Sequence, residues 1–281
     1  MFHLQNFMRY ELVARALAPL HIPPFGGSMI RGALGHALHF SNETAYTHLF
    51  ETGEGHAFVI TPPKPAHLGA GEKFRFFITL FRTAPELQSA FFDALNLAFN
   101  KGLGNWKTPC ELLDITPLEP HFMPLQQSVR LKLASPWYIK YKGQPVKAVN
   151  LNLANFLIAL TQRQRELVKR GYLQANLPDN TSLLAMSDAL QSKMVLQDVV
   201  GERLSNRQHT KHPLQGVIGQ IEIHAPEKNP LTPLGPLLHR AQWLHGGSKT
   251  GFGLGAMEIQ PIAAPVSQLN QLQHLATGAK P

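Results

Sequence analysis

The chain has 281 residues, of which 44% are hydrophobic and 16% charged, and its formal net charge is +8. This length corresponds to about two domains, and the composition excludes a largely disordered chain. The longest strongly apolar stretch, Phe74 to Phe81, is interrupted by Arg75 and is far shorter than the roughly 18 residues of a membrane span. We expect no secretory signal either, and a single cysteine, Cys110, favours a cytoplasmic protein without an internal disulfide.

The first half of the chain predicts the order strand, helix, strand, strand, helix, strand. Periodicity locates a strand over residues 10–22, a helix over 27–40, a strand over 74–80, a helix over 85–102 and a strand over 110–115. Ser28 is the predicted N-cap of the first helix. This order is typical of a ferredoxin-like βαββαβ domain.

The second half repeats that order with other lengths. We expect strands over residues 129–133, 193–199, 217–224 and 256–262, a long helix from about Leu153, and a helix over 234–244. The predicted fold class is therefore α+β, with two tandem ferredoxin-like domains. Their expected limits are residues 1–122 and 123–262, followed by a polar, frayed tail over 263–281.

The net charge is concentrated in one segment. Between Ser128 and Gly171 there are nine basic residues and one acid, Glu166, which accounts for the whole net charge. Such a segment favours a polyanionic partner, with nucleic acid first and an acidic membrane surface second, although a solvated helix face explains the charge equally well. The basic residues predicted to contact RNA are Arg130, Lys132, Lys140, Lys142 and Lys147.

The segment from His245 to Gly255 contains five glycines in eleven residues, between a predicted helix and a predicted strand. A Walker loop is excluded because Ser248 precedes Lys249, and a dinucleotide-binding loop is excluded because a strand follows. HGGS is similar to the oxyanion loop of an esterase, but the esterase nucleophile motif G-x-S-x-G occurs nowhere in the chain. We expect close approach of a phosphate to this backbone, against the alternative of a tight helix-to-strand connection. The glycines concerned are Gly246, Gly247, Gly251, Gly253 and Gly255.

The segment HGGSKTGFGLGAMEI, from His245 to Ile259, is similar to the C-terminal glycine-rich signature of the CRISPR repeat-cleaving endoribonucleases of the RAMP superfamily. Further matches run in family order up to about residue 262: GGSMIRGALGHAL, GLGNWKTPCEL, VRLK, LSNRQ and GVIGQIEI. The resemblance implies cleavage of a repeat RNA, usually beside a short hairpin, without metal or other cofactor. The ribose 2′-hydroxyl attacks the adjacent phosphate, leaving a cyclic phosphate and a 5′-hydroxyl.

The resemblance also implies candidate catalytic residues. In this family a histidine on or just after the first helix is the usual general acid or base, and here His36 and His39 match, with His36 preferred because it lies within the helix motif. Lys249 is the candidate for stabilising charge at the scissile phosphate, and Tyr46 for orienting the nucleophile. We expect no metal site, because the H-x-x-H pairs have no companion cysteine cluster.

Arg31 and Arg207 lie in segments that match the family. They are expected either to grip the RNA backbone or to bridge the two domains through a carboxylate. The expected partner is CRISPR repeat RNA, with other CRISPR effector subunits as further candidates. Two alternatives stay open: a non-catalytic guide-RNA-binding subunit of the same superfamily, and an unrelated basic scaffold.

Overall fold

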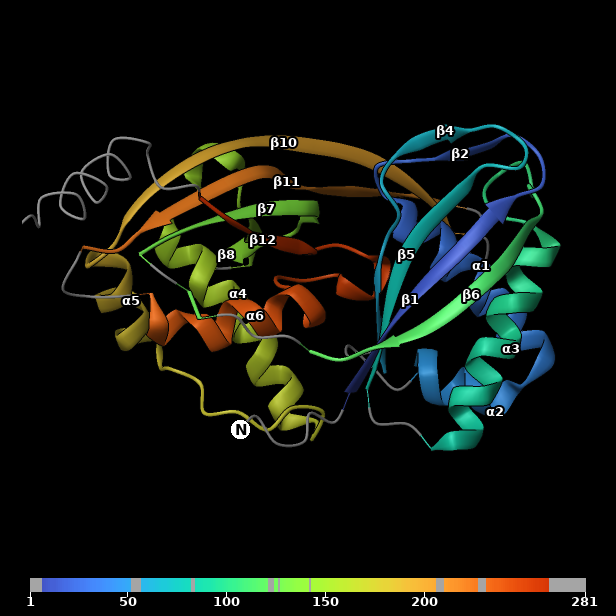
Figure 1. Ribbon diagram of the computed structural model, residues 1–281, viewed down its shortest axis with the longest axis horizontal. Helices are drawn as coiled ribbons and strands as arrows, with labels where there is room; N and C mark the ends of the chain where they lie inside the picture. The colour runs from blue at the N-terminus through green and yellow to red at the C-terminus, as the bar shows by residue number, and fades with distance from the viewer. Residues whose placement is uncertain are drawn as a thin grey trace, which may run out of the picture.

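The computed structural model describes residues 7–51, 57–81, 84–120, 124–125, 127–141, 143–205, 210–226 and 231–262, with only the backbone for 202–205 and 210–213. Within these ranges the chain forms two four-stranded antiparallel sheets, each with helices packed on one face (Figure 1). The boundary predicted between residues 122 and 123 lies between the two folds, because the last strand of the first sheet ends at Leu118 and the second sheet begins at Ser128. The domain limits themselves stay a prediction.

The first sheet has the strand order β3-β5-β1-β6. Its elements are β1 (Phe7–Ala16), α1 (Gly26–Ser41), β3 (Phe58–Thr61), β5 (Lys73–Phe81), α3 (Pro85–Lys101) and β6 (Cys110–Leu118). This is a ferredoxin-like topology. Shorter elements lie between them: β2 (Leu20–Ile22), α2 (Glu43–Tyr46), a π-helical turn (Thr47–Glu51) and β4 (Ala66–Leu68).

Two sequence predictions for the first strand and helix are wrong in detail. The strand expected over 10–22 is two strands, β1 and β2, because the chain turns at residues 17–19, which include a proline. Helix α1 begins at Gly26 with Phe25 as its N-cap and no side-chain cap, so Ser28 lies inside the helix. The helix begins with two glycines, and a Cβ on Gly27 would lie 2.5 Å from the carbonyl oxygen of Phe252. Only glycine allows this close approach of two backbones.

The second sheet repeats the topology, with the order β10-β11-β7-β12. Its elements are β7 (Ser128–Trp137), α4 (Leu153–Lys169), α5 (Asn180–Asp188), β10 (Gln191–Ser205), β11 (Thr210–His224), α6 (Gly235–Leu244) and β12 (Met257–Pro261). Short elements are β8 (Lys140–Tyr141), β9 (Gln144–Pro145) and three 3-10 turns, η2 (Ala148–Asn150), η3 (Thr232–Leu234) and η4 (Thr250–Phe252). The predicted tandem ferredoxin-like fold is therefore confirmed.

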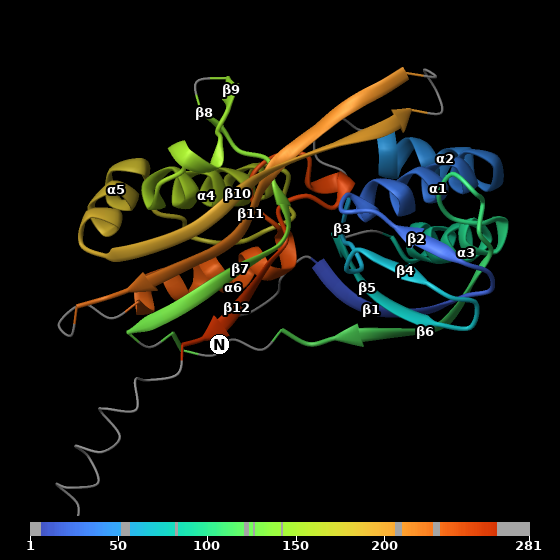
Figure 2. The same ribbon diagram turned by 90° about the horizontal axis from the view of Figure 1, so that it is seen from above.

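Strands β10 and β11 are much longer than the sequence predicts. They pair continuously from Gln191 with His224 to Ser205 with Thr210. The hairpin they form leaves the second sheet and reaches over α1 of the first fold (Figure 2). A Cβ on Gly201 would lie 2.5 Å from the Phe25 ring, so β10 packs directly against the start of α1.

The open face of the first sheet packs against the end of α6. The guanidinium of Arg9, in β1, donates a hydrogen bond of 2.5 Å to the carbonyl oxygen of Gln242, and the Thr79 hydroxyl donates one of 2.8 Å to that of Trp243. An apolar cluster that includes Phe81, Leu167 and Leu244 fills the rest of this contact. The two folds are thus joined through a packed core. None of the described helices is long and apolar enough to cross a membrane.

Candidate nucleic-acid interface

The C-terminal end of α1 gathers three of the predicted catalytic residues. His36 and His39 are both exposed on this helix. The α2 helix follows at once, with Asn42 as its N-cap, and this turn brings the Tyr46 ring to 5.0 Å from the His39 ring. The His36 ring lies 4.7 Å from the ring of Phe40, whose side chain is 69% exposed. We call this group the α1 histidine surface; it consists of His36, His39, Phe40 and Tyr46 with the neighbouring Lys101 and Lys107.

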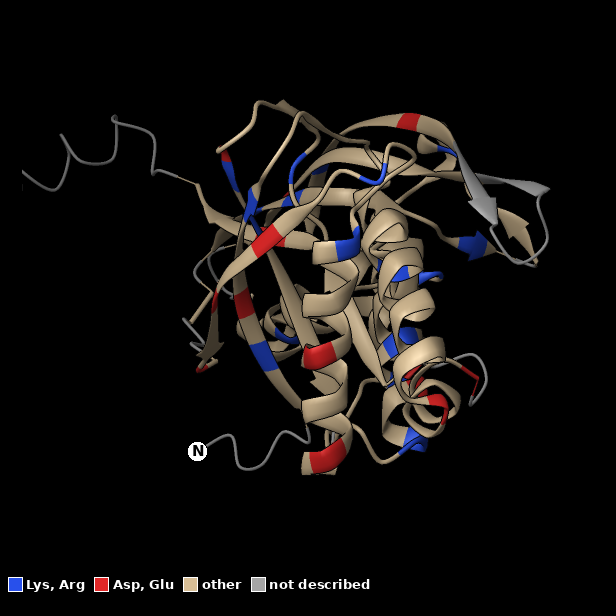
Figure 3. Ribbon diagram, turned by 90° about the vertical axis from the view of Figure 1, so that its right-hand side faces the viewer, with Lys and Arg blue, Asp and Glu red and all other residues tan. Residues whose placement is uncertain are grey.

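The charges that act on His36 are all positive. Its pKa is lowered, first by partial burial and then by the charges of Lys107, Lys101 and His39. The neutral imidazole is therefore favoured, and a neutral imidazole accepts a proton. Helix α3 has an acid, Glu86, in its first turn and a base, Lys101, in its last turn. Figure 3 shows this distribution, with acidic residues in red and basic residues in blue. The α1 histidine surface thus combines a proton acceptor with cations that attract a phosphate.

Lys101, Lys107 and Phe40 were not among the predicted site residues. Lys101 ends α3, and its ammonium lies 6.0 Å from the centre of the Phe40 ring. Lys107 follows in the turn that leads to β6. For Lys107 the available signal was the GLGNWKTPCEL segment, which resembles the family, whereas Lys101 and Phe40 lie outside every segment that carries the resemblance.

Arg31 joins the two folds through aromatic rings. Its guanidinium carbon lies 4.4 Å from the centre of the Phe50 ring and 4.8 Å from that of Phe252, which belongs to the glycine-rich loop. Such stacking is a cation–π arrangement. Phe50 in turn stacks on Tyr46 at 5.4 Å. A continuous row of side chains therefore runs from the α1 histidine surface to the glycine-rich loop. Arg207, the other predicted bridge, lies outside the described residues.

The glycines of this loop have neighbours within the protein itself. A Cβ on Gly246 would lie 2.2 Å from the Trp137 ring, and one on Gly247 would lie 2.7 Å from the Tyr138 carbonyl oxygen. A Cβ on Gly253 would lie 2.8 Å from the Cα of Gly27. A Cβ on Gly255 would clash with the carbonyl oxygen of Gly246, and Gly251 is buried. Internal packing accounts for four of the five glycines, and RNA contact by any of the five stays a prediction.

His245, at the start of the loop, is completely buried. Its Nδ1 donates to the carbonyl oxygen of Leu254 at 2.8 Å, so its Nε2 accepts from the Thr61 hydroxyl of β3, also at 2.8 Å. Burial lowers the pKa of His245 to about 3. Both ring nitrogens are thus engaged, and this histidine joins the two folds without access to a substrate.

Lys249 lies with a different group of residues from His36. It is exposed, and its ammonium lies 4.5 Å from the centre of the Tyr138 ring. Lys140 approaches the same ring at 5.7 Å. The cations that shift the pKa of His36 are Lys107 and Lys101, and Lys249 is not among them. The predicted partnership of Lys249 with the histidines stays a prediction.

The predicted basic residues of the second half are distributed over several surfaces. Arg130 and Lys132 alternate with buried residues of β7 and so lie on the sheet face opposite the core. Arg130 forms an ion pair of 2.7 Å with Glu222 and thereby lowers the pKa of that carboxyl. Lys147 is exposed before η2, whereas Arg163 is only 4% exposed. Lys142 lies outside the described residues.

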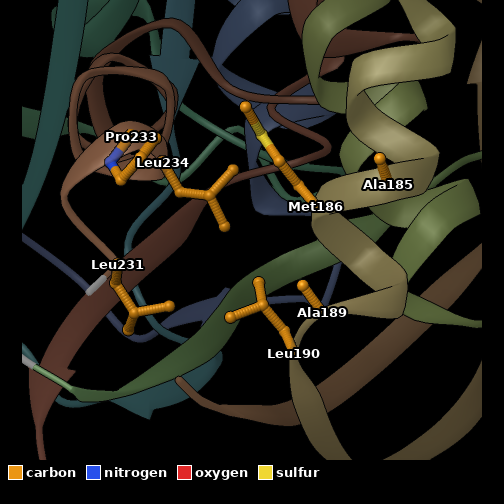
Figure 4. Close-up of a pocket in the computed structure, with 7 residues that line it drawn as sticks. All are labelled: Ala185, Met186, Ala189, Leu190, Leu231, Pro233 and Leu234. Carbon is orange, nitrogen blue, oxygen red and sulfur yellow. The ribbon is translucent and has the colours of Figure 1, made fainter. Parts of the chain in front are cut away.

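A cavity of about 330 Å³ lies between α5 and the segment around η3 that precedes α6 (Figure 4). Its lining includes Ala185, Met186 and Leu190 from the α5 side and Leu231 and Leu234 from the other. These side chains carry no charge, so the cavity has nothing to hold a phosphate. In the part of the chain that the structure describes, no three His, Cys, Asp or Glu side chains gather as a metal site.

Solved structures with the same fold are numerous. A product complex of Thermus thermophilus Cas6 superposes with a TM-score of 0.61 at 14% identity, covering 90% of this chain and all of the other. An RAMP protein that binds different RNA substrates gives 0.56 at 12% identity, covering 90% of this chain and 100% of that one. A chain of the partial Cas6-RT-Cas1–Cas2 complex gives 0.63 at 11% identity, with 92% of this chain and 46% of that one. No curated protein matches the sequence.

The tandem ferredoxin-like fold of this chain is shared by an RAMP protein and by Cas6 proteins of known structure. More specifically, residues 131–257 match the family model of the CRISPR-associated endoribonuclease Cas6, and residues 4–132 match an N-terminal domain model named AF_1859_N. These matches support the resemblance to the CRISPR repeat-cleaving endoribonucleases that the sequence predicts.

Proposed function

We propose that the protein is a metal-independent endoribonuclease that binds CRISPR repeat RNA and cuts it to mature guide RNAs. The observation that carries this proposal is the environment of His36. It is exposed, its pKa is lowered, and the charges that act on it are those of Lys101, Lys107 and His39. A neutral imidazole among cations is suited to accepting a proton next to a phosphate.

In this proposal His36 takes the proton from the ribose 2′-hydroxyl, whose oxygen attacks the adjacent phosphorus. Lys101 and Lys107 stabilise the negative charge that develops on the phosphate oxygens. His39 protonates the departing 5′-oxygen, and Tyr46, 5.0 Å from the His39 ring, orients the reacting ribose. The bond between phosphorus and the 5′-oxygen breaks, which leaves a 2′,3′-cyclic phosphate and a 5′-hydroxyl.

The test is incubation of the purified protein with its host's repeat RNA in excess chelator, beside a copy with a single 2′-deoxy substitution at the mapped cut. We expect cleavage that survives chelation and that disappears with the missing hydroxyl. Cleavage that requires a divalent metal, or that persists in the deoxy substrate, would contradict the mechanism.

The alternative is a guide-RNA-binding subunit that does not cut. Tight, salt-sensitive binding without cleavage in the same experiment would favour this alternative. Further CRISPR proteins are proposed as partners, because one structural neighbour is part of a Cas6-RT-Cas1–Cas2 complex.

A further inference from the structure

Trp106 is the most exposed large hydrophobic side chain among the described residues, at 88%. The turn that carries it is held tightly. Leu103 and Thr108 exchange backbone hydrogen bonds of 2.8 and 3.0 Å across it, and the Thr108 hydroxyl donates to the carbonyl oxygen of Pro19 at 3.0 Å. Gly102 has a φ of 105°, and a Cβ there would lie 2.1 Å from the carbonyl oxygen of Lys107. An indole presented on so constrained a turn points to a binding role.

This turn lies against the same side of α1 as His36. A Cβ on Gly104 would lie 3.4 Å from the Met29 sulfur, and Met29 precedes His36 by seven residues, or about two helical turns. Lys107 comes directly after Trp106, and its charge acts on His36. The exposed indole is therefore next in sequence to a lysine that lies within electrostatic range of the proposed catalytic base.

Two exposed aromatic rings therefore border the α1 histidine surface. Phe40, 69% exposed, is on the α1 side next to His36, and Trp106 is on the turn after α3. Exposed rings interleaved with lysines match a nucleotide strand, because bases stack on rings while phosphates attract ammonium groups. Stacking on a side chain requires a base that is not already paired and stacked in a helix.

We propose that Trp106 is a stacking platform for an unpaired nucleotide next to the scissile phosphate, with Phe40 as a second ring and Lys101 and Lys107 as its phosphate contacts. This inference rests on the proposed function and specifies which part of the RNA the site takes. A single-stranded nucleotide at the cut, rather than the repeat hairpin itself, contacts the turn.

The experiment combines a protein variant with an altered RNA. Binding is measured with repeat RNA that carries the 2′-deoxy substitution at the cut, for the unmodified protein and for Trp106→Ala. In matched RNAs, the nucleotides on either side of the cut are replaced one at a time by an abasic residue. We expect Trp106→Ala to weaken binding of the complete RNA about tenfold, the usual loss for one stacked base. Removal of the stacked base should cause a similar loss for the unmodified protein and none for Trp106→Ala.

Two variants separate stacking from other effects. Trp106→Phe keeps an aromatic face and should recover most of the affinity. Val149→Ala removes another side chain that is 85% exposed, in the second fold, and should leave binding unchanged. The stacking proposal is wrong if Trp106→Ala binds as tightly as the unmodified protein. It is also wrong if, at each nucleotide beside the cut, the affinity lost through the abasic residue simply adds to the affinity lost through Trp106→Ala.

The outcomes for the two proposals can be told apart. If the unmodified protein cuts the repeat but Trp106→Ala behaves identically, only the stacking proposal fails. If the unmodified protein neither binds nor cuts repeat RNA, the proposed function fails, and the stacking proposal fails with it.

Discussion

Two histidines of this protein have a lowered pKa for the same first reason, burial, yet their surroundings differ completely. His245 is enclosed between the two folds, with both ring nitrogens hydrogen-bonded. His36 is exposed at the end of α1, among the charges of Lys101 and Lys107. A shifted pKa alone therefore does not identify a catalytic group. Access to solvent and the sign of the neighbouring charges make the distinction here.

The difference also separates two motifs that resemble the family. The glycine-rich loop is the stronger sequence signal, but its described neighbours are Trp137, Tyr138 and Gly27 of the same chain. The α1 histidine surface is a weaker signal in sequence and is the better candidate for chemistry. On this comparison, changes at His36 should alter catalysis and changes in the loop should alter stability.

The largest expected effect is on the cleavage rate of His36→Ala. Loss of a general base lowers a rate by about 100- to 10,000-fold, so single-turnover cleavage should fall by this factor while RNA affinity stays close to that of the unmodified protein. His39→Ala, measured in parallel, tests its assignment as the proton donor. If His36→Ala cuts at the full rate, His36 is not part of the mechanism.

His245→Ala should instead destabilise the fold. Removing a buried, hydrogen-bonded ring costs about 2–4 kcal/mol of unfolding free energy, measured by denaturant titration. The φ of 60° at His245 is unfavourable for any residue except glycine, so His245→Gly should be about 1 kcal/mol less destabilising than His245→Ala. Equal stability of both variants and the unmodified protein would contradict the joining role of this histidine.

The same residue predicts a pH dependence of stability. Its pKa is about 3 in the fold and about 6.5 in the unfolded chain. The folded state therefore favours the neutral ring, and the resulting stabilisation is complete above pH 6.5 and is lost as the pH falls toward 3. His245→Gly should lose less stability than the unmodified protein over this range, in denaturant titrations at several pH values.

Much of the fold follows from the sequence because periodicity reports burial. The alternation of Phe74, Phe76, Ile78 and Leu80 correctly predicts β5, and the 3.6-residue spacing in 85–102 correctly predicts α3. The short strand β3 has three consecutive buried residues, without alternation, and was not located. The far half of the β10–β11 hairpin was also missed, because it packs across the molecule rather than on its own sheet.

The candidate site was only partly predictable, for a related reason. His36, His39 and Tyr46 are close in sequence, so one helix and one turn bring them together. Lys101 and Lys107 reach His36 only through the packing of α3 beside α1, which no local pattern specifies. Likewise, the five glycines indicate a close approach to the backbone but do not say whether the approaching atoms belong to a ligand or to the protein.

Gly253→Ala tests whether the loop is a structural joint. The new Cβ would lie 2.8 Å from the Cα of Gly27, at a φ of 82°. Gly71→Ala is the matched control, because Gly71 has a φ of 88° and open space around it. We expect a loss of about 1 kcal/mol for the control, from the backbone conformation alone. Gly253→Ala should lose about 2–3 kcal/mol, because the clash adds to that cost. Equal losses would mean that the contact between α1 and the loop contributes nothing.

The smallest expected effect concerns the pH dependence of cleavage. If neutral His36 is the base, the rate on the acidic side of the pH profile rises through the pKa of His36, and the lowered pKa places this rise below pH 6.5. Lys107→Gln removes a cation that lowers this pKa, so the midpoint should move upward by about a few tenths of a pH unit at low salt. Lys140→Gln removes a cation that is not among those acting on His36 and should leave the midpoint unchanged. A midpoint that stays in place, or that moves downward, would show that the lysine of the Trp106 turn does not control the base.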